Sequence, residues 1–566
     1  MADFASEAQL AHVPAELRQR LAAKLAAQTF DMLDVLGLRE DPKGKRSVVV
    51  AADSVKAFQD VWLMDHMFTF AHQRDVRYLL RSNAGLRARL ATMFNVADED
   101  DAVVFAVWDH SLPLHALMIQ TKTPAVFFLE DEIGSAFQRG TKGCAFASAP
   151  IYDAKTGESY TAVWPTRAVL KGDVVAREPL GLYGEPSRRH AVKAALAWVL
   201  ARGGDAPPRW AAAHARLERE TPEAPPEAPE APPAEPLAGL PLGGRALRIY
   251  TDLPWVVDEV TAPRFQVVSD SAAADVVFLA KGGFVTGAEQ LVSFFNYEAA
   301  FVRKDHLSRL LRCAGLGAET APETFDLDVD LDAALHAMTL AGPGAFWILK
   351  PNSLGRSIGH AVTDSRACAV AHALAGGYVA QRYIEHPHVL PGLEKRKYDV
   401  RVVALLRSSE PLEAYVHDTV FIRAANKAHV VSPRALEDVE VSLTAMHLVG
   451  AEARHPSTKL FAEAFDNENG AGAWSNSLKS MRKTCAAVFR AAATQHAGFA
   501  ETRGARAMYG FDFMLSRDLQ PKLLEVTFSP SYLANSPDMA DVYDEFAHEC
   551  MGCLFLGEQA QVTRLE

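Results

Sequence analysis

The segment YGFDFMLSRDLQPKLLEVTFSP, residues 509–530, contains two apolar runs that flank a short polar break. The first run includes Asp512 and the second includes Glu525. Apolar runs of this length around turn residues predict a β-hairpin. With a two-residue turn at Asp518 and Leu519, Asp512 lies directly opposite Glu525, where like charges destabilise the pairing. Such a pair needs a proton on one acid or a cation between the two.

Magnesium is one cation that suits this pair of acids. In proteins Mg²⁺ commonly takes oxygens from one or two carboxylates and completes its shell with water and substrate phosphate oxygens. The alternative is a different register, in which one of the two acids points into solvent. The hairpin alone leaves both possibilities open.

A second polar segment, FWILKPNSLGRSIGH, covers residues 346–360. It predicts an apolar strand that ends at Lys350, followed by a loop with two glycines and Arg356. A lysine at a strand end can meet a phosphate as a point charge, and glycines let backbone N–H groups approach it. The segment lacks the GxxxxGK[ST] pattern of a Walker A loop, and a surface loop is an equally good explanation.

A third segment, EKRKYDVR at residues 394–401, concentrates Lys397 and Arg401 with two further cations around Asp399. Arg423 adds a positive charge at the end of a later predicted strand. In a protein with a net charge of −12, such a cluster suggests anionic ligands, although a solvated charged face is the usual explanation.

Length and composition restrict the class of protein. The chain has 566 residues, of which 49% are hydrophobic and 23% charged, so about two to four globular domains are expected. The negative net charge argues against a general nucleic-acid binder. No run of about 18 apolar residues predicts a membrane span, and the N-terminus does not resemble a secretory signal.

The cysteines indicate a reducing compartment. Six cysteines in a chain of this length do not make a disulfide framework, and Cys550 and Cys553 form a lone CxxC without a second pair. We therefore expect ordinary packing for these two thiols rather than a redox or zinc site. A cytoplasmic protein is predicted, and cytoskeletal association or a nuclear pool would be compatible with it. The oligomeric state stays open.

The pattern along the chain predicts a multidomain protein that combines α/β and α+β architecture. Residues 1–100 read as mainly helical, with helices expected over 15–37 and 76–94, and 101–204 read as β-rich, with strands in 101–109, 124–137 and 158–173. Residues 205–243 read as a linker, within which TPEAPPEAPEAPPAEP (221–236) is an extended spacer after a helix over 188–204. Residues 244–566 alternate strands and helices, and their late strands are expected to be antiparallel.

The segments ILKP, QRYIEHP, KYDVRV, FIRAAN and YGFDFML…LLEVTFSP, in this order, resemble the tubulin–tyrosine ligase-like family. That resemblance implies an ATP-grasp fold and an ATP- and Mg²⁺-dependent enzyme that joins amino acids to the acidic tails of tubulin. It covers most of residues 245–550. VWLMDHMFTF, FFLEDEIGSAF and YTAVWPTR in the first half resemble the branch of this family with a SET-like N-terminal region.

The resemblance implies roles for particular residues, carried over position by position. Nucleotide binding would fall to Lys350, Arg356, Gly359, Gln381, Arg382, Tyr383, Ile384 and Asp399. The catalytic cations would be Lys397, Arg401 and Arg423. The Mg²⁺ ligands would be Asp512 and Glu525, with Thr527 at the position where the family has an asparagine. The ion would then neutralise the two facing acids.

Three positions depart from the family pattern. Thr527 replaces the asparagine ligand, the phosphate loop reads Arg356-Ser357-Ile358-Gly359 where the family has R-G-x-G, and Leu443-Thr444-Ala445 replaces L-T-N. These changes suit two hypotheses: an active ligase, or a pseudo-ligase that binds nucleotide and tubulin and regulates tail modification. The SET-like region lacks N-H-x-x-x-P-N, so an interaction module is expected there rather than a methyltransferase. For His66, His110 and His190 we expect packing or surface roles rather than metal binding.

Overall fold

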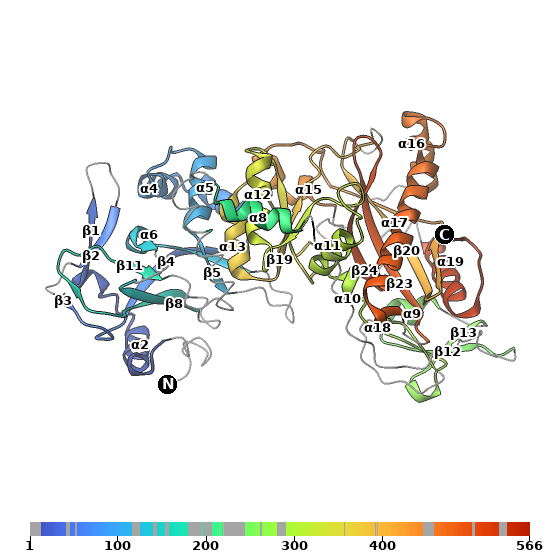
Figure 1. Ribbon diagram of the computed structural model, residues 1–566, viewed down its shortest axis with the longest axis horizontal. Coiled ribbons are helices and arrows are strands. Elements are labelled where there is room, and N and C mark those ends of the chain that lie inside the picture. The colour runs from blue at the N-terminus through green and yellow to red at the C-terminus, as the bar shows by residue number, and fades with distance from the viewer. Residues whose placement is uncertain are drawn as a thin grey trace. The chain divides into compact units, whose positions relative to one another are not determined.

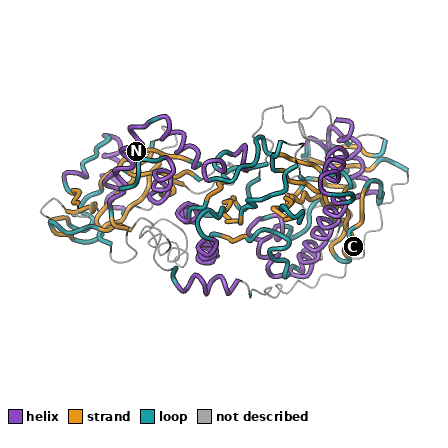
Figure 2. The backbone as a smooth tube through the Cα atoms, turned by 90° about the horizontal axis from the view of Figure 1, so that it is seen from above, coloured by secondary structure: helices purple, strands orange, loops and turns teal. Residues whose placement is uncertain are grey.

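The computed structural model describes eighteen stretches of the chain: residues 13–40, 46–50, 54–115, 125–139, 144–152, 158–178, 195, 206–217, 219, 244–260, 263–279, 290–355, 357–390, 392, 394–444, 458–500, 504–530 and 540–566. The chain divides into two compact units (Figure 1). The first unit comprises Met1–Ala215, Phe325–Leu354 and Ile358–Ala380. The second comprises Arg216–Thr324, Gly355–Ser357 and Gln381–Glu566. In both units the strands are bordered by helices (Figure 2), so the predicted mixed α/β character is confirmed.

The N-terminal part of the first unit is built on a seven-stranded sheet with the order β5-β6-β4-β9-β8-β11-β7. Its strands are β4 (Trp62–Phe70), β5 (Leu112–His115), β6 (Val126–Glu130), β7 (Gln138–Arg139), β8 (Phe146–Tyr152), β9 (Ser159–Pro165) and β11 (Ala176–Glu178). Two small antiparallel pairs accompany it: β1 (Leu36–Glu40) with β2 (Arg46–Val50), and β3 (Ser54–Val55) with β10 (Val169–Leu170). Its helices are α2 (Ala15–Ala27), η1 (Met32–Asp34), α3 (Gln73–Ser82), α4 (Ala84–Phe94), α5 (Asp100–His110) and α6 (Glu132–Ala136).

Residues 1–100 contain the expected helices, but four strands lie among those that the structure describes. The helix expected over 15–37 ends at Ala27, and β1 and β2 follow it. Strand β4, before residue 100, pairs with β9, after it, so the predicted boundary near residue 100 does not separate two sheets. The helical expectation over 76–94 is confirmed as α3 and α4, which meet at Asn83, whose side chain accepts a hydrogen bond from Leu86 N and caps α4.

The strand predicted over 101–109 is also wrong, because these residues form helix α5. A short run in which nearly every residue is apolar fits a buried helix as well as a strand. Asp100 and Asp101 occupy the first turn, where the positive end of the helix dipole favours acids. Val104 and Trp108, one turn apart, are both buried. The strands expected within 124–137 and 158–173 are confirmed by β6, β9 and β10.

Residues 324–382 form a second, four-stranded sheet with the order β16-β19-β17-β18. Its elements are β16 (Thr324–Asp326), α12 (Leu331–Ala341), β17 (Trp347–Pro351), β18 (Ala361–Thr363), α13 (Arg366–Ala375) and β19 (Tyr378–Arg382). Helix α8 (Pro208–Leu217) lies within the predicted linker 205–243, so the first part of that linker is helical. The spacer 221–236 and all but residue 195 of the helix predicted over 188–204 lie outside the described residues.

The second unit joins a parallel sheet, β13-β12-β14-β15, to an antiparallel sheet, β24-β23-β20-β21-β25, in which β22 also pairs with β20. The strands of the parallel sheet are β12 (Leu247–Thr251), β13 (Phe265–Val267), β14 (Val276–Phe278) and β15 (Leu291–Val292). The antiparallel strands are β20 (Tyr398–Ser409), β21 (Leu412–His417), β22 (Phe421–Ala424), β23 (Ala507–Leu515), β24 (Pro521–Phe528) and β25 (Val562–Arg564). The expectation of antiparallel late strands is therefore confirmed.

Helices of the second unit border these sheets. They are α9 (Pro254–Glu259), η2 (Ser271–Ala273), α10 (Ala299–Val302), α11 (Lys304–Cys313), α14 (Pro433–Leu436), α15 (Val439–Ser442), α16 (Thr458–Asn469), α17 (Ala473–Gln495), α18 (Ala497–Ala500), α19 (Ala540–Met551) and η6 (Gly552–Leu556). The longest of these helices, α17, packs on β20, β21 and β24. In the parts of the chain that the structure describes, no helix is both long and apolar enough to cross a bilayer.

The alternation of β20 positions the site. Val400 and Val402 point into the core cluster that α17 covers, and Val403 and Leu405 point into the opposite cluster with α19. Because successive side chains alternate, the second face continues toward the start of the strand through Arg401, Asp399 and Lys397. A face that is apolar at one end of the strand is therefore charged at the other.

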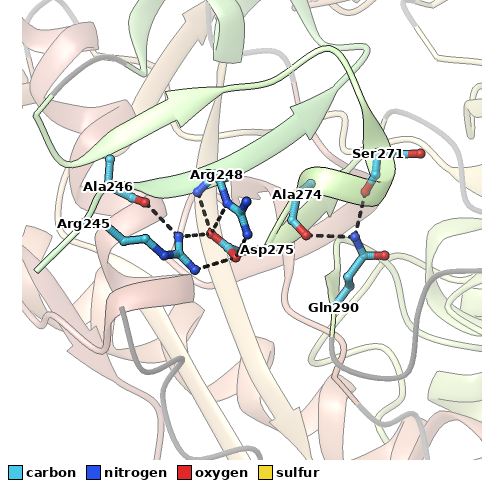
Figure 3. A network of polar contacts seen from close by, with 7 residues as sticks. All are labelled: Arg245, Ala246, Arg248, Ser271, Ala274, Asp275 and Gln290. Carbon is cyan, nitrogen blue, oxygen red and sulfur yellow. Dashed lines mark hydrogen bonds and ion pairs between the residues drawn. The ribbon is translucent and has the colours of Figure 1, made fainter. Parts of the chain in front are cut away.

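A carboxylate shared by two arginines anchors the parallel sheet (Figure 3). Asp275, just before β14, accepts hydrogen bonds from Arg245 Nη1 at 2.6 Å and from Arg248 Nη2 at 2.9 Å, and also from Arg248 N at 2.9 Å. Although burial opposes it, these donors hold the pKa of Asp275 well below its usual range. Gln290 Nε2 donates hydrogen bonds to the carbonyls of Ser271 and Ala274, which hold the residue before β15 against the segment before β14.

Candidate active site

The hairpin β23–β24 places Asp512 opposite Glu525, as the sequence predicts. The two-residue turn is wrong, however. Leu515 pairs with Pro521, and Ser516 N donates to Gln520 O, so three residues form the loop, with Leu519 in the left-handed region at φ 60°. The register of the pairing shifts by one residue at a β-bulge beside Asp512, and this shift places Asp512 directly opposite Glu525.

Asp512 is neutralised by two arginines from neighbouring strands. Arg401, its cross-strand partner on β20, donates Nε to Oδ1 at 2.7 Å and Nη2 to Oδ2 at 2.8 Å. Arg423 on β22 brings Nη2 within 2.9 Å of the same Oδ2. Such a bidentate fork fixes direction as well as charge. Gly510 makes room for it, since a Cβ there would lie 3.2 Å from Arg401 Nε and 2.8 Å from Pro530 Cβ.

Asp399 extends this network along β20. Its Oδ1 accepts from Arg423 Nε at 2.5 Å, and its Oδ2 accepts from the Thr444 hydroxyl. Burial raises the pKa of Asp399 above its usual value despite the opposing guanidinium of Arg423, and the neighbouring Asp512 raises it further. Burial opposes the charge on Arg423 too, but Asp399 and Asp512 hold the pKa of its guanidinium above the ordinary range.

Glu525 has a separate counter-ion that the sequence reasoning missed. Lys304 Nζ lies 3.0 Å from Glu525 Oε2, and the lysine side chain is 9% exposed. Lys304 is the first residue of α11. A cation in a first turn opposes the helix dipole, so its position in the sequence was a weak signal of a partner elsewhere.

Lys397 completes the charged face. It is 3% exposed, its Nζ donates to the Tyr383 hydroxyl at 2.8 Å, and that hydroxyl donates to Ser442 O at 3.0 Å. Burial raises the pKa of Tyr383, which keeps its hydroxyl protonated. Lys397, Asp399, Arg401 and Arg423, which the sequence placed in one site, are therefore brought together with Tyr383.

Three more residues predicted to bind nucleotide, Gln381, Arg382 and Ile384, lie at or just after the end of β19. Gln381 is buried and donates Nε2 to Thr324 Oγ1 at 3.0 Å and to the carbonyl of Leu524, beside the bulge, at 3.5 Å. Arg382 N donates to Glu323 O, and its Nη2 lies 2.9 Å from Glu385 Oε1. Ile384, two residues beyond the end of β19, is partly buried.

The predicted phosphate-binding residues lie on β17 and the loop after it. Lys350 is 5% exposed, one residue before the end of β17. Gly359 has φ +71°, a left-handed conformation that favours glycine. Both belong to the first unit, and Arg356 lies outside the described residues.

The donor set at the hairpin fits a magnesium–nucleotide complex. Asp512 and Glu525 supply carboxylate oxygens, Glu525 is 22% exposed, and Thr527 lies two residues from it on the same strand face. In the described part of the chain no three His, Cys, Asp or Glu residues gather as a metal cage. Mg²⁺ needs none, because phosphate oxygens and water can complete its shell.

Charge in the cluster favours an anionic ligand. Four cations (Lys304, Lys397, Arg401 and Arg423) accompany three carboxylates (Asp399, Asp512 and Glu525). At a site that is largely shielded from water, electrostatic attraction between these cations and an anionic ligand is strengthened.

The other residues singled out from the sequence have packing roles. His66 is buried between the hydroxyls of Ser159 and Thr161, each 2.8 Å from a ring nitrogen, and the His110 ring stacks on Phe94. His190 lies outside the described residues. Cys550 and Cys553 are free and fully buried, and burial raises the pKa of both thiols.

Comparison with known families agrees with this arrangement. A model described as the tubulin-tyrosine ligase family matches residues 287–562, which include every site residue named above. A second model, described as the tubulin tyrosine ligase SET-like domain, matches residues 41–201. The chain therefore belongs to the tubulin–tyrosine ligase-like family, and the resemblance drawn from its motifs is confirmed.

Some individual relatives are similar to the chain over nearly its whole length, including the SET-like region. The chain is 26% identical over 622 residues to tubulin–tyrosine ligase-like protein 12 of Mus musculus, covering 98% of this chain and 94% of the relative. The Homo sapiens protein of that name is 26% identical over 92% of this chain and 88% of its own length. A probable tubulin polyglutamylase, TTLL9 of Bos taurus, is 29% identical over 28% of this chain and 35% of its own.

Proposed function

We propose that this protein is an ATP- and Mg²⁺-dependent ligase of ATP-grasp type that attaches an amino acid, by tyrosination or glutamylation chemistry, to the acidic tails of tubulin. The observation that supports it most is the charged face of β20, β22, β23 and β24, where two facing acids are surrounded by four cations. Membership of the ligase family and the similarity to tubulin polyglutamylases supply the substrate class.

The residues of the chain would divide the work in the following way. Bound ATP with Mg²⁺ would supply the phosphoryl group that activates a carboxylate for attack by an amine. Asp512 and Glu525 would hold the metal, and Lys350 and Lys397 would face phosphate oxygens. Arg401 and Arg423, already oriented by Asp512, would hold a carboxylate substrate in place and offset its charge.

Lys304 has a supporting part in this scheme. Its ion pair orients the Glu525 carboxylate on the face of the hairpin before any ligand arrives. Tyr383 orients Lys397, since the Tyr383 hydroxyl donates a hydrogen bond to Ser442 O and accepts one from the Lys397 ammonium. Both contacts prepare charged groups in advance and so lower the cost of ordering them on binding.

A pseudo-ligase that binds nucleotide and tubulin and regulates tail modification is the second candidate. Thr527 is the observation that favours it, because a threonine hydroxyl is a shorter and weaker ligand than an asparagine amide. Both Asp512 oxygens are also engaged by arginines before a metal binds. Its tubulin binding would weaken with salt, because basic residues would meet acidic tails.

The test is amino-acid incorporation into tubulin by the purified full chain, with ATP, Mg²⁺ and labelled tyrosine or glutamate. We expect incorporation, and a loss of about 100-fold or more with Glu525→Gln, because the variant removes a charge that stabilises the metal–phosphate complex. Glu463→Gln makes the same change at an exposed position of α16 and should leave the rate unchanged. Equal rates for the two variants would exclude this site as the catalytic one.

The variant Thr527→Asn separates the two candidates. If the threonine only weakens metal binding, the asparagine should raise incorporation roughly tenfold, in line with about 1.4 kcal/mol from one added ligand. If neither the wild type nor Thr527→Asn incorporates either amino acid, while both bind tubulin and are stabilised thermally by ATP with Mg²⁺, the pseudo-ligase is supported. Lys350→Ala should abolish that thermal stabilisation.

A further inference from the structure

Helix α13 is buried on every side. Residues 367–375, ACAVAHALA, contain no charged side chain, and all nine are buried. A helix that covers one face of a sheet normally leaves an opposite polar face in water, whereas a helix that is apolar all round is enclosed. The matched ligase family includes this helix, so something outside its own sheet must cover its second face.

The SET-like half supplies that cover. Helix α13 contacts α12 of its own segment on one side and β5 and α5 of the SET-like half on the other; Figure 1 shows α13 beside β5. The small alanine side chains of α13 allow these elements to approach closely. Both partners lie within the first unit.

Four buried rings occupy the contact. His372 of α13 lies 4.9 Å from Phe127 and 5.7 Å from Trp108, ring centre to ring centre, and 4.8 Å from Tyr378 of its own segment. All four side chains are at most 2% exposed. His372 Nδ1 is 2.8 Å from Cys368 O, and burial lowers the pKa of His372 to about 4, so the ring is neutral at pH 7 and suits an apolar contact.

A second contact lies on α8, which follows the SET-like half in the chain. Trp210 of this helix is fully buried, and Arg209 Nε lies 3.0 Å from Asp332 Oδ2 at the start of α12. The ring of His214 lies 5.5 Å from that of His336 on α12 and 5.9 Å from that of Phe325. The two contacts engage neighbouring helices of the same segment.

We propose that the SET-like half is an obligatory docking partner for residues 325–380 of the ligase domain, the segment that carries Lys350 and Gly359. The ligase domain of this chain would then be incomplete by itself, because α13 would expose an apolar face to water. The two halves would stay associated through α13 and α8 without a covalent connection. This proposal does not depend on whether the protein ligates amino acids.

The experiment cuts the full chain after it has folded. A recognition site for a specific protease is placed within 221–236, a stretch that has little apolar material to bury, and the two fragments are then followed by size exclusion and mass photometry. We expect them to elute together at about 1 µM after cleavage. Fragments that separate at once at that concentration would overturn the proposal.

A matched pair of histidine variants locates the docking surface. His372→Ala should raise the dissociation constant of the fragments at least about tenfold, because it leaves a cavity among the four rings. His388→Ala removes a buried histidine that contacts Tyr398 and Phe465 in the second unit, and should leave the constant unchanged. Equal effects of the two variants would exclude α13 as the docking surface.

A milder variant keeps the test decisive if His372→Ala fails to fold. Arg209→Glu should weaken association about threefold, and Arg209→Glu with Asp332→Arg should restore it. Arg216→Glu, at an exposed position of the same helix, is the control. Failure of the double variant to restore association would count against the α8 contact.

Discussion

Two networks of polar residues lie within β-sheets of this protein, and they differ in access to solvent. The SET-like network links β4, β6, β8, β9 and β11 and consists of His66, Glu130, Ser148, Ser159, Thr161 and Arg177. Glu130 and Arg177 have fully buried side chains that pair with each other. In the ligase network Arg401, Arg423 and Glu525 keep side-chain exposures of 12%, 19% and 22%.

The two networks also differ in charge. In the SET-like sheet the network contains one carboxylate, on Glu130, and one guanidinium, on Arg177. Burial, and to a smaller extent the charge of Arg177, lowers the pKa of His66 and keeps its ring neutral. In the ligase sheet four cations accompany three carboxylates, and three of these side chains stay partly exposed. The same residue types are therefore buried in two different settings, and solvent access and charge composition distinguish the candidate site from the structural network.

The largest stability effect is expected from Arg177→Met. This variant removes the guanidinium that pairs with Glu130 in the fully buried sheet, which should reduce the free energy of unfolding by about 3–5 kcal/mol. Urea denaturation followed by tryptophan fluorescence measures it. A loss below about 1 kcal/mol would mean that water reaches this network, and the contrast between the two regions would disappear.

The same substitution in the ligase network should cost less stability and more function. With Arg401→Met, Arg423 still pairs with Asp512 and water can enter, so a loss of about 1–2 kcal/mol is expected. Tubulin-dependent incorporation should fall at least about tenfold, because the carboxylate substrate loses a positioned cation. A stability loss as large as that of Arg177→Met, with activity unchanged, would make this network structural too.

The smallest effect concerns the pH dependence of the SET-like half. The pKa of His66 lies below its unfolded value of 6.5, so under pH 6.5 the unfolded chain binds a proton that the native ring refuses. The free energy of unfolding should therefore decrease as the pH is lowered through this range, by up to about 1.4 kcal/mol per pH unit from His66. The difference between wild type and His66→Gln, measured by denaturation from pH 7 to 5.5, isolates this contribution from the other buried histidines. If the difference in stability between wild type and His66→Gln does not change with pH, the pKa of His66 is not lowered in the folded protein.

Local patterns predicted a large part of the fold and site. The EKRKYDVR segment indicated a cluster of cations around Asp399, and the two apolar runs of the hairpin placed Asp512 against Glu525. These succeed because a strand repeats every two residues, whatever surrounds it.

Features decided by distant packing were missed. The run that forms α5 is apolar enough for a strand or a helix, and only its burial against β6 and α13 decides between them. Lys304 lies more than two hundred residues from Glu525, and the arginine counter-ions of Asp512 became visible only when β20, β22 and β23 were assembled. Partners of this kind are properties of tertiary structure and not of spacing along the chain.

The bulge beside Asp512 isolates the two acids from the tip of their hairpin. Since the extra residue is absorbed between the tip and the acids, a deletion or insertion in residues 516–520 can be compensated there without moving Glu525 to the opposite face of its strand. A one-residue change of register between the two acids themselves would instead turn Glu525 away from its partner. The hairpin tip is accordingly the place to insert a label or an epitope while leaving the charged face intact.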